Sequence, residues 1–543
     1  VNAQTGEFSA TPAWSAAAQL DGLTAAQLAE RVVVTSAANF SAGAVFDLAT
    51  VGAALNPGGL FGDGVVTQRM LDYLRGDRTR EGTAVDQLRP RRGRFGAVVG
   101  STPVLNKAAN TGFVAANDGF LHAIDIATGK ERWVFAPRSA LQEMGRSTQR
   151  TWAFQTIHDG SPVVGKLQDG TEMLFGGLGT AGVGWSGLDT SSAAANLPAA
   201  QRAGSVKWEL PGADTVLQGQ MGLSVGKPIF VKSSKPAWGE VVILSSGYNA
   251  PNAQGKGRVF VVNPRTGALL ATLTTPDTGA VGDPGLAQLN AFREVDGTVR
   301  YLYGGDERGN LWRFDLGDES SSPSVLRVAQ LRSATGAAQP VTAAPALVEY
   351  QGKRIVMVGT GRVLGQADFS APASVQQSFY AILDDGSADL DVRGSRLVAQ
   401  TITVQGTDRF ILEALPVSWT PPEHRGWRVD FPAGEQINLQ PLIGLNAVAL
   451  TTNVPSTAAC DLKAYLYRLG IVSGAPVPVP GEDADQVGEA MNGGGAVGSD
   501  LYQTPDGNIW RGDRPSDGPP GPILFELPGA GTPRKAGWRQ VVR

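Results

Sequence analysis

A long unit of apolar runs and short polar turns recurs along this 543-residue chain and limits the folds that it can adopt. Residues 113–137, FVAANDGFLHAIDIATGKERWVFAP, show the pattern: Asn-Asp-Gly and Ala-Thr-Gly-Lys separate three apolar runs. Six copies follow one another from Gly100 onward, and a proline precedes the first apolar run in five of them: Pro103, Pro162, Pro228, Pro345 and Pro441. A unit of three or four short strands cannot bury both of its faces alone, so the units must pack on one another. The repeat therefore predicts an all-β protein with the β-propeller fold.

Turn residues within the copies support this prediction. Asn117-Asp118-Gly119 is expected to form a hairpin turn, because Asn, Asp and Gly tolerate positive φ. Gly129 marks the next turn, and similar turns are expected near Gly267 and Asn310. We expect seven blades, with six or eight as alternatives, and residues 390–431 are a candidate source of the seventh blade.

The composition divides the chain into three parts. Residues 1–99 form a partly helical lead segment that is expected to dock on the propeller; the spacing of apolar residues predicts a helix over 64–75 that stops at Gly76. Residues 100–475 form the propeller, and residues 476–543 form a Gly/Pro-rich segment that could complete a blade. The chain begins at Val1 rather than Met, so we interpret it as a processed or excised fragment.

The composition argues against several classes of function. The net charge of −4 does not favour nucleic-acid binding, and no apolar run reaches the 18 residues of a membrane span. The single cysteine, Cys460, excludes an intrachain disulfide. The three histidines, His122, His158 and His424, lie far apart in the sequence, so a multi-histidine metal site is not expected.

Two kinds of motif bear on the chemistry of the chain. The phrase AIDIATGKERW, which ends at Trp133, matches the blade motif of quinoprotein dehydrogenase propellers, where a tryptophan locks adjacent blades. We interpret it as structural and keep a quinoprotein (PQQ) oxidoreductase as the alternative function, because a bound quinone needs further contacts that we do not find. Carboxylates gather at residues 294–307 and 384–391, where oxygen ligands could bind Ca²⁺, but neither stretch has a full calcium-loop pattern. Acidic turn residues are the preferred interpretation of both stretches.

An ordered series of phrases resembles the C-terminal β-propeller region of the PilY1/PilC proteins of type IV pili. The phrases include MLDYLRGDRTRE, FVAANDGFLHAIDIATGKERWVFAP, GGDERGNLWRFDL, VGTGRVLG, QQSFYAILDDG and GWRVDFPAGEQI, and they cover most of the chain. The resemblance implies a non-enzymatic protein that supports type IV pilus assembly, retraction control, surface adhesion and twitching motility. It also implies export to the periplasm or cell surface, at the pilus tip.

The same resemblance implies partners and a metal. The expected partners are minor pilins of the tip complex, with host or abiotic surfaces contacted through an N-terminal region outside this chain. The family's calcium loop corresponds here to a shorter stretch that retains Glu294 and Asp296 as its acids, so it implies a reduced Ca²⁺ site. Partner-binding loops are predicted at residues 181–205, 249–256 and 365–378. A lectin-like propeller is a further rival, although the divergence of the copies does not favour it.

Overall fold

The computed structural model describes residues 11–370, 375–420, 423–444, 446–456, 462–478, 483–503, 509–516 and 521–524. Strands occupy 36% of the chain and helices 13%, which confirms the all-β class. The chain forms two compact units, each with its own buried core. The N-terminal unit comprises Pro12–Ser233 and Ala237–Asp283, and the C-terminal unit comprises Ser234–Pro236 and the described residues from Pro284 onward.

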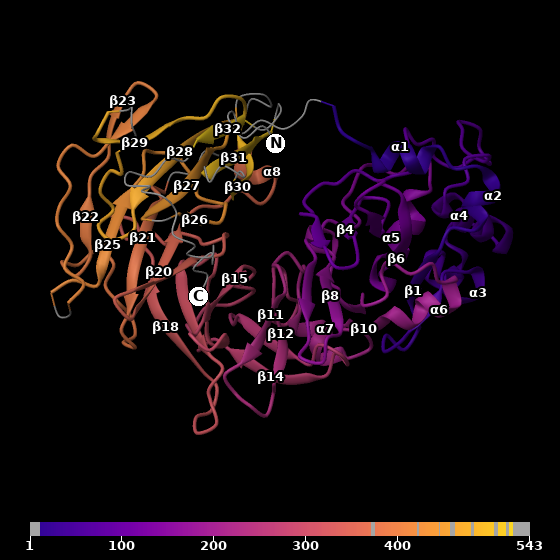
Figure 1. Cartoon of the computed structure of the whole chain (residues 1–543), viewed down its shortest axis with the longest axis horizontal. Helices are drawn as coiled ribbons and strands as arrows, with labels where there is room; N and C mark the ends of the chain where they lie inside the picture. Colours follow the sequence, from indigo (N-terminus) through magenta and orange to yellow (C-terminus); the bar gives the residue numbers. More distant parts are fainter. Residues whose placement is uncertain are drawn as a thin grey trace. The chain divides into compact units, whose positions relative to one another are not determined.

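Three successive antiparallel meanders form the sheets of the N-terminal unit, which runs from indigo to magenta in Figure 1. The strands of the first are β3 (Val104–Asn106), β4 (Thr111–Ala115), β5 (Leu121–Asp125) and β6 (Glu131–Ala136). The second contains β7 (Val163–Lys166), β8 (Glu172–Gly177), β9 (Trp185–Asp189) and β10 (Val206–Leu210). The third contains β11 (Ile229–Ser233), β12 (Glu240–Ser245), β13 (Arg258–Val262) and β14 (Leu269–Thr274). The expected turns are confirmed at Gly119 and Gly129, whose φ values are 94° and 71°.

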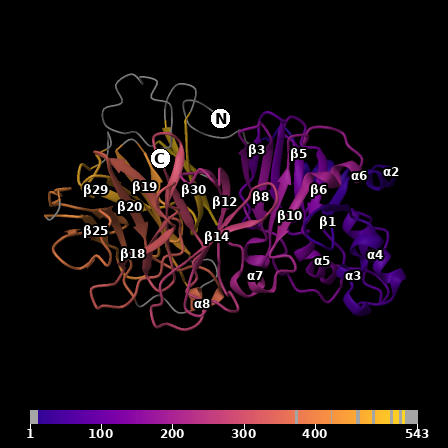
Figure 2. The ribbon, with the colours of Figure 1, turned by 90° about the horizontal axis from the view of Figure 1, so that it is seen from below.

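The lead segment extends the first sheet and covers it with helices. Strand β1 (Val33–Ser36) pairs in parallel with β6, and β2 (Gly43–Val45) pairs with β1. The helices of this segment are α1 (Ala16–Asp21), α2 (Ala25–Ala29), α3 (Leu48–Leu55) and α4 (Gly64–Arg75). Helix α5 (Leu141–Ser147), which follows β6, lies with α3 and α4 beside β1 in Figure 2. Helix α4 ends as predicted, because its C-cap Gly76 adopts a φ of 114°. No helix among the described residues is long and apolar enough to cross a membrane.

The C-terminal unit continues the meanders. Strands β15 (Leu289–Arg293), β16 (Thr298–Gly305), β17 (Asn310–Asp315) and β18 (Ser324–Gln330) pair in order. The next sheet has the order β19-β20-β21-β25-β22, with β19 (Ala346–Tyr350), β20 (Lys353–Gly359), β21 (Ser378–Asp384), β22 (Val398–Gln400) and β25 (Gly426–Asp430). It is followed by β23 (Thr403–Gln405), β24 (Asp408–Phe410), β26 (Leu442–Ile443), β27 (Ala447–Val454), β28 (Lys463–Gly470) and β29 (Gln486–Ala490). A last sheet contains β30 (Ala496–Gln503), β31 (Ile509–Pro515) and β32 (Gly521–Leu524).

The prediction that residues 390–431 supply a seventh blade is wrong, because this stretch does not form a sheet of its own. Strand β25 is instead the fourth strand of the meander that begins at β19, and β22 pairs in parallel with its outer edge. Strand β24 pairs with β29 of the following sheet. The inserted residues thus add strands to the edges of two sheets, and the number of blades stays a prediction.

Tryptophans connect neighbouring sheets, as expected for Trp133. Its indole N–H donates to the carbonyl of Ala193, in the next meander, at 3.2 Å. Trp208 donates to Pro264 O at 2.8 Å and Trp427 donates to Ile471 O at 3.0 Å, so the contact is repeated along the chain. Trp14 of the lead segment makes the same contact with Ile126 O of the first sheet at 2.8 Å. The lead segment therefore gives the first sheet the tryptophan contact that a preceding sheet gives elsewhere.

Candidate functional site

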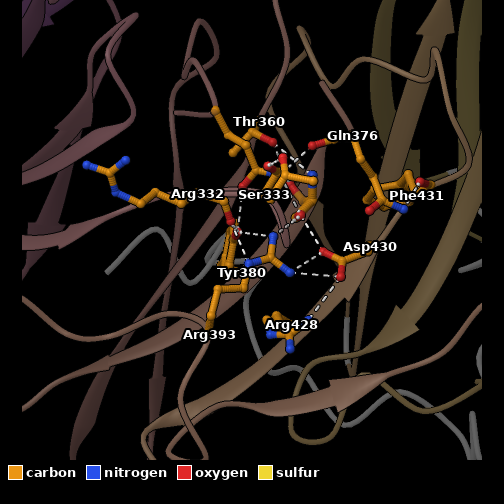
Figure 3. Close-up of polar contacts among 12 residues, drawn as sticks. Arg332, Ser333, Thr360, Gln376, Tyr380, Arg393, Arg428, Asp430 and Phe431 are labelled. Carbon is orange, nitrogen blue, oxygen red and sulfur yellow. Dashed lines mark hydrogen bonds and ion pairs between the residues drawn. The ribbon is translucent and has the colours of Figure 1, made fainter. Parts of the chain in front are cut away.

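A polar cluster in the C-terminal unit, drawn in Figure 3, joins three connections that follow strands of two sheets. We call it the Arg393 cluster; its members are Arg332, Gln339, Thr360, Gln376, Ser378, Tyr380, Arg393, Arg428, Asp430 and Phe431. The connections follow β18, β20 and β25, and β21 begins at the end of its sheet where β20 and β25 finish. Because β20 and β25 both run antiparallel to β21, their carboxyl ends lie beside the amino end of β21.

Asp430 is the centre of the cluster. Its carboxylate accepts hydrogen bonds from Arg393 at 2.8 and 2.9 Å, from the Ser378 hydroxyl at 2.5 Å and from Arg428 at 3.0 Å. The guanidinium of Arg332 points away, and only its carbonyl takes part, accepting from Arg393 Nε at 2.5 Å (Figure 3). Two guanidinium groups thus share one carboxylate.

Tyr380 ties the cluster to the connection after β18. Its hydroxyl lies 2.5 Å from Gln339 Oε1 and receives a hydrogen bond from Arg393 at 3.0 Å. Burial raises the pKa of Tyr380 to about 12, against a smaller opposing effect of the Arg393 charge. The hydroxyl is therefore neutral at physiological pH and can donate to Gln339 while it accepts from Arg393.

The cluster anchors both ends of the loop between β20 and β21, in which a partner-binding loop is predicted at residues 365–378. At its far end, Gln339 donates to the Gln376 carbonyl at 2.6 Å and Gln376 donates to Phe431 O at 3.0 Å. At its near end, the Thr360 hydroxyl accepts from Ser378 N at 2.8 Å. The loop contains α8 (Gln366–Ser370), while residues 371–374 lie outside the described residues and Ser378 already belongs to β21. A loop with fixed ends can present side chains to a partner at low entropic cost.

Replacing Asp430 with Asn is expected to destabilise the C-terminal unit by about 1–3 kcal/mol, because Arg393 and Arg428 lose their shared charged acceptor. Amide hydrogen exchange in residues 361–369 should rise at the same time, because the loop loses its support. Urea unfolding and exchange measurements check both effects. The matched control is Asp389→Asn at an exposed pair with Arg327, where about 0.5 kcal/mol or less is expected. Equal effects of the two variants would contradict the assignment of a central role to Asp430.

Of the other two predicted loops, one differs from expectation and one agrees with it. Residues 185–189 of the 181–205 stretch form β9, so the prediction of one long loop there is wrong. The apolar residues of this stretch are needed to complete the second sheet. The remainder contains Arg202, which is 1% exposed and donates to Ala195 O at 2.7 Å. Residues 249–256 do form a connection without regular structure, between β12 and β13, with positive φ at Asn249 and Gln254.

Glu294 and Asp296 lie together in the hairpin turn between β15 and β16. Asp296 is exposed, and its Oδ1 accepts from the backbone N–H and the hydroxyl of Thr298 at 2.9 and 2.7 Å. The Glu294 carbonyl accepts from Gly297 N at 2.9 Å, which closes the turn. Ca²⁺ prefers six to eight oxygen ligands, and the described part of the chain holds no group of three or more His, Cys, Asp or Glu arranged for a metal.

Both carboxylate stretches are dispersed in the structure. Asp306 lies beyond the opposite end of β16 from Asp296, where it accepts from the indole of Trp312 at 2.9 Å. In the second stretch, Asp384 accepts from Arg313 and from the Tyr303 hydroxyl at 2.5 Å. Burial opposes the charge on Asp384, but these two partners outweigh it and lower the pKa of its carboxyl. The preferred interpretation of these acids as structural groups therefore agrees with their positions.

The central residues of the Arg393 cluster were not among the residues singled out from the sequence. Arg428 and Asp430 alternate in GWRVD, so they share a face of β25, and this period-two pairing was the available signal. Arg393 and Tyr380 carry no local signal, because their contacts join residues that are distant in the sequence.

Comparisons with known proteins give consistent results. A model of the PilY1 beta-propeller domain matches residues 96–411. A type IV pilus biogenesis factor PilY1 homolog of Xylella fastidiosa is 28% identical over 90% of this chain and 37% of its own length. The type IV pilus biogenesis factor PilY1 of Pseudomonas aeruginosa strain PAK is 29% identical over 74% of this chain and 40% of its own length. The crystal structure of the Pseudomonas aeruginosa PilY1 C-terminal domain is 25% identical, with a TM-score of 0.60 over 76% of this chain and 92% of that one. The chain thus spans about two fifths of the length of these curated relatives.

Proposed function

Because the chain belongs to the PilY1 beta-propeller family, we propose that it is the propeller module of a type IV pilus biogenesis factor and acts by binding protein partners. The observation that carries the proposal is the family match over residues 96–411, more than half of the chain. The β-propeller fold, which the similarity to the PilY1 C-terminal domain supports, provides the scaffold. Loops held at fixed positions by a rigid scaffold are a common way to present binding residues.

The finer role follows from the relatives. We propose that minor pilins of the tip complex are the partners and that the module supports pilus assembly, control of retraction and twitching motility. It would then work in the periplasm or at the cell surface, at the pilus tip. We propose that adhesion to a host or abiotic surface depends on a region outside this chain, since the full-length relatives are longer than this chain. The loop between β20 and β21, whose ends the Arg393 cluster fixes, is the proposed contact.

The family match does not favour the quinoprotein alternative. That alternative depended on the phrase that ends at Trp133, and the indole of this residue donates to Ala193 O between two sheets. The phrase therefore has a packing role in this chain, which agrees with its structural interpretation.

The test is to delete the segment that corresponds to this chain from the full-length protein in its own bacterium. We expect loss of most surface pili, counted by electron microscopy, and loss of twitching zones. Complementation with the intact protein should restore both, and immunoblots of exported protein control for its level. Normal pili and twitching in the deletion strain would overturn the proposal.

We further propose that Glu294 and Asp296 bind Ca²⁺ weakly, because the hairpin turn supplies only part of a calcium shell. With a dissociation constant near the millimolar concentration used, mass action stabilises the fold by only about 0.4 kcal/mol. Millimolar calcium is therefore expected to raise the melting temperature by about 1 °C or less relative to chelator, at matched ionic strength. Asp296→Ala should abolish the rise. A rise of several degrees, or one that survives in Asp296→Ala, would contradict this assignment.

A further inference from the structure

Strand β14 leaves one edge of its sheet without a paired strand. It is the last strand in the order of its sheet and pairs with β13 on one side only, in the part of the chain that the structure describes. Its residues, Leu-Leu-Ala-Thr-Leu-Thr, include no charge and no proline, and Thr272 and Thr274 are exposed. Unprotected edges of this kind are ready templates for pairing with another chain, and proteins usually blunt them with charge, proline or very short strands.

Several other strands that lie at one end of their sheets are protected against pairing with another chain. Strands β2, β22 and β23, which end their sheets, have only three residues each. Strand β10 carries Lys207 and Glu209, and β18 carries Arg327 and forms a parallel bridge to Leu390. Strand β32 contains Pro522. Among these edges, β14 combines length with the lack of any protecting residue.

The chain itself shows what such an edge accepts. Strand β6 is the fourth strand of the first meander, as β14 is of the third, and it receives β1 as a parallel strand. Strand β25 receives β22, and β18 receives Leu390, also in parallel. The added strands are short and uncharged, Val-Val-Thr-Ser in β1 and Val-Ala-Gln in β22.

The correspondence between β6 and β14 extends to single residues. Each follows a turn glycine with a φ of 71°, Gly129 or Gly267. Each has an irregularity three residues after that glycine, where the register with the neighbouring strand shifts. Beyond it, β1 pairs with Val134, Phe135 and Ala136, and Val134 N–H donates outward to Val32 O at 3.0 Å. The residue of β14 at the same distance from the glycine as Val134 is Thr272.

We propose that the free edge of β14 binds an extended, uncharged segment of a protein partner, which adds to the sheet as a parallel strand opposite residues 272–274. The partner's backbone carbonyl would accept from Thr272 N–H, as Val32 O accepts from Val134 N–H. Backbone hydrogen bonds would supply affinity, and small or β-branched side chains would suit the pleated surface beside the edge. This inference rests on the proposed role of the module in binding proteins, and it names a second surface for that role, besides the loop at the Arg393 cluster.

The test uses Thr272→Pro, which removes the outward N–H and leaves the pairing of β14 with β13 intact. Thr272→Ser is the matched control, because it keeps the N–H. The probe is the acetylated and amidated peptide Val-Val-Val-Thr-Ser-Ala, the sequence of residues 32–37. At a peptide concentration near its dissociation constant, half of the sites are occupied, so amide exchange in β14 should slow about twofold in the intact protein and in Thr272→Ser. Thr272→Pro should show no slowing.

No slowing of exchange in β14 of the intact protein would overturn the proposal. Light scattering tests the other occupant: a dimer of the intact protein that Thr272→Pro abolishes would mean that a second copy covers the edge. If Thr272→Pro does not fold, Thr272→Lys is used in its place, because it puts a charge at the same exposed position of the edge. In cells, the full-length protein with Thr272→Pro should give fewer pili than Thr272→Ser. Normal pili with Thr272→Pro would overturn only the docking edge, whereas normal pili without the whole segment would overturn the proposed function.

Discussion

Replacing Glu131 with Gln is expected to lower the free energy of unfolding of the N-terminal unit by about 3–5 kcal/mol, the usual cost of removing one partner from a buried ion pair. Glu131 lies in β6, and its carboxylate accepts from Arg31 at 2.6 and 2.8 Å and contacts His122 Nδ1 at 2.8 Å. The other ring nitrogen of His122 lies 3.1 Å from Asp118. The His122 side chain is fully buried, and Phe95 stacks on its ring at 4.3 Å. Two acids and two bases thus balance their charges in the core.

The protonation of this cluster makes the stability depend on pH. Burial by itself lowers the pKa of His122, but Asp118 and Glu131 outweigh it and raise the pKa to about 9. Burial likewise raises the pKa of Glu131, but Arg31 and His122 outweigh it and lower the pKa to about 2. The stabilisation from His122 is complete below its ordinary pKa of about 6.5 and is lost as the pH rises through 9. The stabilisation from Glu131 is complete above its ordinary pKa and is lost as the pH falls through 2.

Urea unfolding at pH 3, 6, 7.5 and 9.5 measures both effects, because pH 3 lies in the range where the Glu131 contribution is lost and pH 7.5 and 9.5 lie in the range where the His122 contribution is lost. The intact protein should be most stable at about pH 6, and Glu131→Gln should lose much of the decline toward pH 9.5, because His122 then titrates at a lower pH. An NMR titration of the His122 ring gives its pKa directly. The control is Glu143→Gln at the exposed pair with Arg146, where about 0.5 kcal/mol or less is expected. A Glu131→Gln protein with the stability of the control would contradict the importance of the buried cluster.

Trp208→Ala is expected to destabilise the same unit by a similar amount, about 3–5 kcal/mol. The indole is 2% exposed, stacks on Phe175 with the ring centroids 6.1 Å apart and donates to Pro264 O in the next meander. Gly267 leaves room for the ring, because a Cβ there would lie 2.7 Å from it. Replacement with Ala therefore removes both a large buried surface and a hydrogen bond between two sheets.

Trp208→Phe separates the two contributions. It keeps an aromatic ring and loses the N–H, so a loss of about 1 kcal/mol from the hydrogen bond, with a further cost from the smaller ring, is expected in urea unfolding. The comparison variant is Trp14→Ala, which removes the corresponding indole at Gly129 but from a side chain that is only partly buried. Its expected effect is smaller than that of Trp208→Ala. If Trp208→Ala unfolded at the same urea concentration as the intact protein, the connecting role of this tryptophan would be refuted.

Long-range strand pairing limited the prediction of sheet edges. The apolar run around Val398 and the polar hairpin around Gly406 indicated strands, but their sheets could not be assigned from local pattern. Strand β22 joins β25 and strand β24 joins β29, which is more than 75 residues away. The choice of partner depends on which sheet edge is free in space, and the sequence around each strand carries no information on that. The free edge of β14 is invisible in the sequence for the same reason.

Local chemistry determined much of this protein from the sequence by itself. Asn-Asp-Gly and Thr-Gly turns, the repeated prolines and Gly76 after a helical pattern specify where strands and helices begin and end, because these residues restrict or permit particular φ values. The repeated units specify a β-propeller, because a lone unit cannot bury its faces. Only the tertiary structure brought Asp430 to Arg393 and Glu131 to Arg31, and only it separated Asp296 from Asp306 at opposite ends of one strand. Such contacts depend on how distant segments pack, since the energy of an ion pair or hydrogen bond is set by the burial and geometry of both partners.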